Sequence, residues 1–72
     1  MFGTKLRNLR KANNLSQQKL SEIIGTPQTT ISDWENNKYL PDINEAIKIA
    51  EALGVSVVEL LEEQIDASAA SR

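Results

Sequence analysis

The chain has 72 residues, of which 40% are hydrophobic and 25% are charged, a composition typical of one small globular domain. It contains no Cys and no His, which excludes disulfides and removes the usual proton shuttle and the commonest metal ligand. The net charge of −2 argues mildly against binding to nucleic acid. Because the sequence shows no signal peptide and no apolar span, we expect a soluble, cytoplasmic protein.

The first two predicted helices precede a Gly-Thr-Pro break. The first begins near Phe2 and ends at Asn13-Asn14. Its apolar stripe is Phe2, Leu6 and Leu9. The second helix is expected to follow an N-cap at Ser16 and to stop at Gly25. Its inward residues are expected to be Leu20, Ile23 and Ile24.

The third predicted helix carries the only Trp of the chain. Thr26 is expected to be its N-cap and Pro27 its first helical residue, and the helix is expected to run to about Asn36. Asn37 is suited to the left-handed conformation that follows a helix end. The second and third helices, closely spaced around Gly25, are a candidate helix-turn-helix.

The fourth predicted helix follows a loop of sequence KYLP. Asp42 is its expected N-cap, Glu45 occupies its third position, and Gly54 ends it. Its inward stripe is expected to be Ile43, Ala46, Ile47, Ala50 and Leu53.

A short fifth helix is predicted after an N-cap at Ser56 and reaches Leu61 or slightly further. Residues 63–72 are expected to form a short polar tail. The sequence therefore predicts an all-α fold, a compact five-helix domain over residues 1–62, with no strand and no repeat.

The outer face of the third helix is rich in hydrogen-bonding side chains. With Ile31 at the centre of the inner face, Trp34 and Glu35 border it at about 60° and about 40°. The outward residues are Gln28, Thr29, Ser32, Asp33 and Asn36. Amides, hydroxyls and carboxylates can bind base edges in the major groove of DNA. An ordinary solvated face is the alternative interpretation.

Charge is unevenly distributed along the chain. Residues 1–38 contain six Lys or Arg and three acidic residues, giving +3, whereas residues 39–72 contain two basic and seven acidic residues, giving −5. Such a distribution can orient a protein on a polyanion although the total is negative. Solvated helix faces would explain it equally well.

Five short pieces of the chain form a specific pattern through their order and spacing. They are LR at 9–10, LSQQKLSE at 15–22, IG at 24–25, TISDWEN at 30–36 and IAEALGVS at 49–56. With them, the segment from Leu6 to Leu61 resembles the phage repressor/Cro-like (XRE-type) helix-turn-helix family. The resemblance implies a lambda-repressor-like fold and a sequence-specific, double-stranded DNA-binding regulator of transcription.

The resemblance also assigns roles to residues of this sequence. Base contacts are implied for Gln28, Thr29, Ser32 and Asp33. Contacts to the DNA backbone are implied for Gln17, Asn36, Lys38 and Tyr39. A carboxylate such as Asp33 is repelled by phosphates unless it finds a donor, so it should weaken binding to unsuited DNA.

A salt bridge is expected between the first and third helices. Arg10 lies one turn after Leu6, beside the apolar stripe, and Glu35 lies beside Ile31 and Trp34. The family that the chain resembles often pairs these two positions. We predict an ion pair that is at least partly buried; two independent surface charges are the alternative.

The fifth helix suggests a homodimer. Its apolar residues cover a wider arc than one core-facing stripe requires, and the family usually has a polar residue at the position of Val58. The expected interface consists of Val58, Leu60, Tyr39 and Leu40, with Ile65 if the helix extends. Such a dimer would bind a palindromic operator with half-sites about 34–36 Å apart. The alternative is that these residues only close a small core.

A DNA-binding repressor is thus the leading hypothesis. An antitoxin-like or other protein-interaction module on the same fold is the alternative, with the acidic second half and the tail from Glu62 as the partner surface. We do not expect the protein to be an enzyme or to bind a cofactor or metal, because catalysis would depend on carboxylates that are scattered near helix starts.

Overall fold

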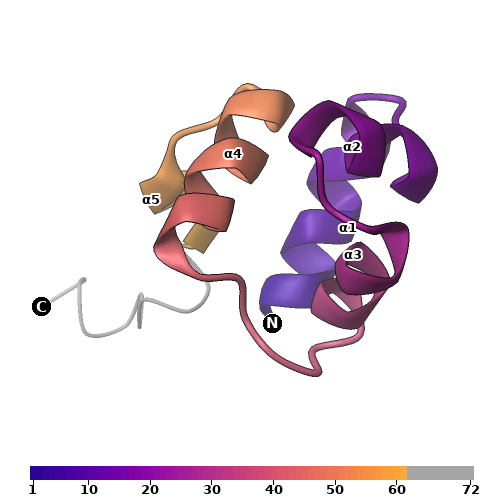
Figure 1. The fold of residues 1–72 in the computed structure, drawn as a ribbon. Coiled ribbons are helices and arrows are strands. Elements are labelled where there is room, and N and C mark those ends of the chain that lie inside the picture. The colour runs from indigo at the N-terminus through magenta and orange to yellow at the C-terminus, as the bar shows by residue number, and fades with distance from the viewer. Residues whose placement is uncertain (62–72) are drawn as a thin grey trace, which may run out of the picture.

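The computed structural model describes residues 1–61, which form five α-helices and no strand (Figure 1). The helices are α1 (Phe2–Ala12), α2 (Gln17–Ile24), α3 (Gln28–Glu35), α4 (Ile43–Leu53) and α5 (Val57–Leu61). The predicted all-α class and its five helices are confirmed for this part of the chain. The predicted tail at 63–72, its boundary at residue 62 and Ile65 lie outside the described residues.

Short-range capping explains where most helices begin and end. Three of the four predicted N-caps accept a hydrogen bond from the third helical amide: Ser16 from Lys19 (2.9 Å), Asp42 from Glu45 (2.8 Å) and Ser56 from Glu59 (2.9 Å). Gly25 and Gly54 end α2 and α4 in the left-handed conformation, with φ of 71° and 72°. These side chains and glycines therefore define the boundaries locally, as predicted.

The predicted start of α3 is wrong by one residue. Pro27 has an extended ψ of 143° and is the N-cap residue, so the first helical residue is Gln28. Thr26 lies outside the helix, buried, and its side chain makes no capping hydrogen bond. At the other end α3 stops at Glu35, and Asn37 adopts the predicted left-handed conformation with φ of 62°.

All five helices contribute to one apolar core, whose burial is the main driving force for folding. The buried apolar residues are Phe2, Leu6, Leu20, Ile24, Ile31, Trp34, Ala46, Ile49, Ala50, Leu53 and Leu60. Leu9, Leu15, Val55 and other half-buried residues pack around this core.

Three residues predicted to face the core are exposed instead. The exposed fractions are 51% for Ile23, 62% for Ile43 and 40% for Ile47, whereas Ile49, absent from the predicted stripe, is fully buried. Apolar residues cover more than half of the circumference of α4, so the helical period defines an apolar arc without fixing its rotation. Contacts with α2 and α5 then select which part of this arc is buried.

The helices form two groups on either side of α1 (Figure 1). α2 and α3 pack against each other and lie on one side, while α4 and α5 lie on the other. The two groups are joined by α1, which packs against both α3 and α5, and by direct packing of α2 against α4. None of the helices in the described part of the chain has the length and apolar character needed to span a bilayer.

Candidate nucleic-acid interface

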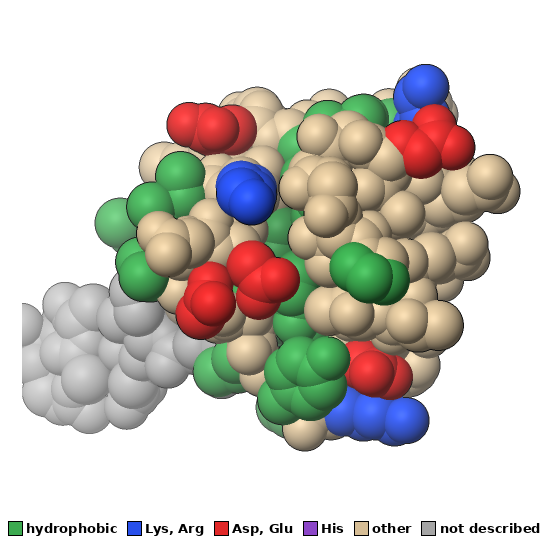
Figure 2. Space-filling model, viewed as in Figure 1, with side chains coloured by type: hydrophobic (Ala, Val, Ile, Leu, Met, Phe, Trp, Pro, Cys, Tyr) green, Lys and Arg blue, Asp and Glu red, His purple; other side chains and the backbone are tan. Residues whose placement is uncertain are grey.

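The outer face of α2 and α3 is polar but carries few charges. In Figure 2 most of this half of the molecule is tan, the colour of the backbone and of side chains that are neither hydrophobic nor charged. On α3, Gln28 and Thr29 are exposed and Ser32 and Asp33 are half-buried. The four residues predicted to contact bases therefore remain accessible to solvent, whereas Ile31 on the opposite side of the helix is fully buried.

Two of these four side chains already have a partner in the free protein. Asn36 Nδ2 donates to Ser32 Oγ over 3.3 Å, and Lys38 Nζ lies 3.5 Å from Asp33 Oδ1. Lys38 thus supplies the donor that Asp33 needs. An exposed ion pair contributes only about 0.2–1 kcal/mol to stability, so Lys38 and Asp33 can exchange each other for groups of a ligand. Within residues 1–61, the side chains of Gln28 and Thr29 have no hydrogen-bond partner.

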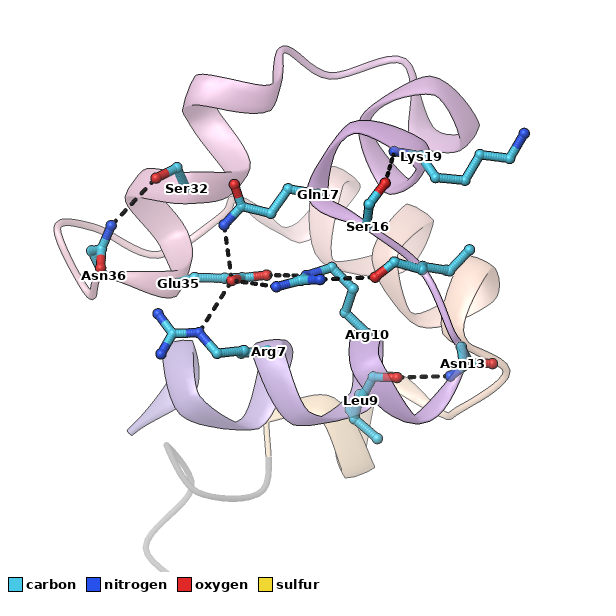
Figure 3. A network of polar contacts seen from close by, with 11 residues as sticks. Arg7, Leu9, Arg10, Asn13, Ser16, Gln17, Lys19, Ser32, Glu35 and Asn36 are labelled. Atoms are coloured by element: carbon cyan, nitrogen blue, oxygen red, sulfur yellow. Dashed lines mark hydrogen bonds and ion pairs between the residues drawn. The ribbon is translucent and has the colours of Figure 1, made fainter.

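The predicted salt bridge between Arg10 and Glu35 is present and buried (Figure 3). Arg10 Nε donates to Glu35 Oε2 over 2.6 Å, and Arg10 Nη2 donates to Oε1 over 3.1 Å. Both side chains are shielded, with exposed fractions of 10% and 0%. Arg10 Nη1 also donates to the Leu15 carbonyl over 2.8 Å, which ties the turn before α2 to the same guanidinium.

Two further donors reach Glu35, and sequence reasoning missed both contacts. Gln17 Nε2 donates to Oε1 over 3.0 Å, and Arg7 Nε donates to the same oxygen over 3.4 Å. One carboxylate on α3 therefore joins the first residue of α2 to two arginines of α1 (Figure 3). Arg7 precedes Arg10 by three residues and hence lies on the same side of α1, which is the sequence signal that could have identified it.

The surroundings of Glu35 favour its charged form. Burial alone would raise the pKa of the carboxyl, but the hydrogen bonds from Arg10 and Gln17, the Arg10 charge and the Arg7 contact outweigh it. The pKa of Glu35 therefore lies below its ordinary value. The hydrogen bond to Glu35 correspondingly raises the pKa of Arg10, so the pair is fully ionised at neutral pH.

A close backbone contact also holds α3 against α1. A Cβ on Gly3 would lie 2.7 Å from the carbonyl carbon of Glu35 and 2.8 Å from the carbonyl oxygen of Trp34. The Gly3 amide donates to Asn37 Oδ1 over 2.8 Å, so the second residue after α3 satisfies one of the free amides at the start of α1. The absence of a side chain at residue 3 allows this approach.

The predicted dimer surface is correct only in part. Val58, Tyr39 and Leu40 are exposed, with fractions of 68%, 51% and 52%. Leu60 is wrong as an interface residue because it is fully buried in the core of its own chain. Hydrophobic side chains gather at the edge of the molecule over α4 and α5, and the exposed ones of these helices include Ile43 (Figure 2).

The fold and this polar face define a helix-turn-helix protein, in which α2 and α3 form the two helices of the motif. The chain belongs to the helix-turn-helix family, whose family model matches residues 6–60. The XRE-type resemblance deduced from the sequence is therefore confirmed.

Named relatives include both activators and repressors. The chain is 37% identical over 60 residues to the HTH-type transcriptional activator BcrR of Enterococcus faecalis, covering 83% of this chain and 29% of BcrR. It is 38% identical over 56 residues to the cryptic phage CTXphi transcriptional repressor RstR of Vibrio cholerae serotype O1, covering 78% of this chain and 50% of RstR. The chain thus spans half or less of the length of these two relatives.

Two solved structures share the fold. SinR, the master regulator for biofilm formation, superposes in its complex with DNA with a TM-score of 0.81 at 32% identity, over 85% of this chain and 98% of that one. The complex of SinR with SinI gives a TM-score of 0.83 at 32% identity, over 89% and 63% of the two chains. The family and these relatives are DNA-binding regulators of transcription, not enzymes.

Proposed function

We propose that this protein is a sequence-specific repressor that binds double-stranded DNA by placing α3 in the major groove. The observation that carries the proposal is the exposed start of α3, where Gln28 and Thr29 have no partner within residues 1–61 although the opposite side of the helix is firmly packed. Similarity to the phage repressor RstR, half of whose length the chain spans, supports repression.

The solvent-accessible side chains of α3 carry groups that match base edges. The Gln28 amide can bond N6 and N7 of adenine together, and the Thr29 methyl can contact the thymine methyl. Asp33 can accept from N4 of cytosine, and Ser32 can bond either kind of edge. In the bound state Lys38 would leave Asp33 for a phosphate, while Asp33 turns to a base.

Contacts to the DNA backbone are proposed for Gln17, Asn36, Lys38 and Tyr39. Gln17 is the first residue of α2, where backbone amides are free to bind a phosphate. Asn36 and Lys38 follow the end of α3 and are exposed. These contacts on both sides of α3 would fix its depth and register in the groove, so that base contacts can discriminate between sequences.

A two-fold dimer on a palindromic operator completes the proposal. Exposed apolar residues lie on α4, α5 and the loop before α4: Tyr39, Leu40, Ile43, Ile47 and Val58. A second copy packed there would leave both recognition helices free for half-sites about 34–36 Å apart.

Selection of bound sites from a random pool of duplex DNA tests the proposal. A repressor of this kind enriches one motif, and Gln28→Ala changes the preference at one base pair at a cost of about 1–3 kcal/mol. Asn44→Ala removes an exposed amide from α4 and serves as the matched control, with an unchanged motif expected. Failure of the wild type to enrich any motif would refute sequence-specific binding.

Two charge changes separate backbone contacts from base contacts. Lys38→Ala should weaken binding to all sequences alike and lower the slope of log K against log salt by about 0.9. Asp33→Asn should raise affinity for random DNA, because it removes a repulsive charge and releases Lys38 from its ion pair. An altered motif in Lys38→Ala would instead place that residue among the base contacts.

A protein-binding function is the second candidate. The exposed apolar side chains on α4 and α5 favour it, and SinR is found in a complex with the protein SinI. A module that binds only protein would show little affinity for random duplex DNA at low salt. Steep loss of affinity with rising salt would indicate phosphate contacts and support DNA binding.

A further inference from the structure

The polar junction around Glu35 carries surplus positive charge at its exposed edge. One carboxylate contacts two guanidinium groups, so the cluster of Arg7, Arg10 and Glu35 has a net charge of +1. The Arg10 side chain is nine-tenths buried and bonds both oxygens of Glu35, so the charge of the carboxylate neutralises the charge of Arg10. The surplus charge therefore resides on Arg7, whose side chain is 44% exposed.

Only part of the Arg7 guanidinium is used within residues 1–61. Nε donates to Glu35 Oε1 over 3.4 Å, and the two terminal nitrogens have no partner there. Figure 3 shows these nitrogens on the far side of the guanidinium from Arg10, pointing out of the network. A guanidinium held through Nε presents a planar pair of donors, the arrangement that suits a phosphate.

Arg7 lies close to a residue already proposed to contact the DNA backbone, Gln17. Arg7 and Gln17 donate to the same oxygen of Glu35, so the two side chains lie next to each other. Glu35 directly precedes Asn36 in the chain. Other cations near the motif are paired with acids, Lys38 with Asp33 at 3.5 Å and Lys19 with Glu22 at 3.8 Å.

We propose that Arg7 of α1 is a DNA-backbone-contacting residue, and that Glu35 is the positioning residue that directs its guanidinium to the phosphate beside Gln17. The proposal rests on the DNA-binding function proposed above and extends its interface to a third helix. The buried carboxylate then has two roles. It holds α3 through Arg10, and it aligns the first residue of α2 and Arg7 against one strand of the duplex.

Salt titrations of the full chain on a random duplex and on a selected site test this inference. Arg7→Gln is expected to lower the slope of log K against log salt by about 0.9, equivalent to about fivefold weaker binding at about 0.15 M salt, on both duplexes. Lys48→Gln removes the same charge from the exposed side of α4, and its slope should equal that of the wild type. Arg7→Lys restores the charge and should restore most of the slope.

Folding is monitored in parallel by thermal unfolding, because Arg7 also contacts Glu35. If Arg7→Gln is unfolded, the comparison of Arg7→Lys with the wild type tests the phosphate contact instead. The contact predicts that Arg7→Lys binds DNA more weakly but keeps the wild-type salt slope. Unchanged affinity of Arg7→Lys overturns the proposal. Equal slopes for Arg7→Gln, Lys48→Gln and the wild type also overturn it while leaving DNA binding intact. A wild type without salt-dependent binding to any duplex refutes the proposed function itself and the Arg7 contact with it.

Discussion

The two halves of the molecule are held together by different kinds of contact. α1 and α3 share the apolar core, but they are also joined by directional polar contacts: the ion pair of Arg10 and Glu35, and the Gly3 amide bonded to Asn37. The contacts of α4 with its neighbours are mostly apolar, made by small and branched side chains such as Ala46, Ala50 and Leu60, and Asn13 Nδ2 also donates to the Leu53 carbonyl over 3.2 Å. Hydrogen bonds and ion pairs are directional, whereas the hydrophobic effect is not.

This difference matches what each half is proposed to do. Base contacts require α3 to be placed accurately, and donors from α1 and α2 converge on Glu35 at its last turn. The α4–α5 half bears exposed apolar side chains, where a partner can pack without a fixed hydrogen-bond pattern. The fold thus combines a polar junction beside α3 with an apolar surface on the other side.

The largest expected effect comes from breaking the polar junction. Arg10→Met leaves Glu35 buried with its main partner removed, and we expect the free energy of unfolding to fall by about 3–5 kcal/mol. Urea denaturation followed by circular dichroism measures this loss. Leu60→Ala, which opens a cavity in the apolar half, should cost a similar amount of about 2–5 kcal/mol.

The double variant Arg10→Met/Glu35→Leu sharpens the contrast. If both charges are removed together, apolar packing can replace the pair, and most of the stability lost in Arg10→Met should return. Gln17 and Leu15 lose their partners in this variant, so recovery is incomplete. A loss of only a few tenths of a kcal/mol in Arg10→Met would show that the pair is solvated and contributes little.

The backbone contact at Gly3 should give the next largest effect. Gly3→Ala places a methyl group against the carbonyl groups of Trp34 and Glu35, so α1 and α3 must separate, at a cost of about 1–3 kcal/mol. Thr4→Ala changes the adjacent exposed residue and should shift the free energy of unfolding by less than about 0.5 kcal/mol. Equal stabilities of the two variants would mean that the helices move apart freely.

Acidification should destabilise the polar junction selectively. The folded-state pKa of Glu35 is lowered, so the ionised carboxylate stabilises the folded protein. This contribution to the free energy of unfolding is fully present above the unfolded-state pKa of about 4.3 and is lost as the pH falls through the folded-state pKa. We expect a smaller loss than in Arg10→Met, since a neutral carboxyl still accepts hydrogen bonds. Urea denaturation of the wild type and Glu35→Gln between pH 6 and pH 2 should therefore show a weaker acid dependence in the variant.

Local chemistry made much of the fold predictable from the sequence. The caps at Ser16, Asp42 and Ser56 depend on residues three positions away, so they were correct. The predicted rotation of α4 about its axis was wrong, because its apolar residues cover too wide an arc for the helical period to decide whether Ile47 or Ile49 is buried. Thr26 failed as a cap because the extended conformation of Pro27 removes it from the first turn of α3.

The candidate site was predictable to the extent that helical geometry determines it. The outward direction of Gln28 and Thr29 follows from α3 alone. The contacts of Gln17 and Arg7 with Glu35 bridge 18 and 28 positions along the chain. The three-residue spacing places Arg7 on the same side of α1 as Arg10, but no local pattern indicates the contact of Gln17. Leu60 was misplaced because an apolar arc does not distinguish a core residue from an interface residue.

The smallest effect on stability, but the clearest effect on assembly, is expected at Val58. Its side chain is 68% exposed, so Val58→Glu should change the free energy of unfolding of the monomer by less than about 0.5 kcal/mol. In a two-fold dimer through α5 the new carboxylates would approach each other and lose water, which disfavours association.

Sedimentation velocity should show the wild type associating at high micromolar concentration and Val58→Glu remaining monomeric. Thr4→Glu adds the same charge to an exposed position of α1 and should associate like the wild type. A wild-type monomer at that concentration, with no cooperativity between operator half-sites, would contradict the dimer and leave the proposed DNA contacts of α3 untouched.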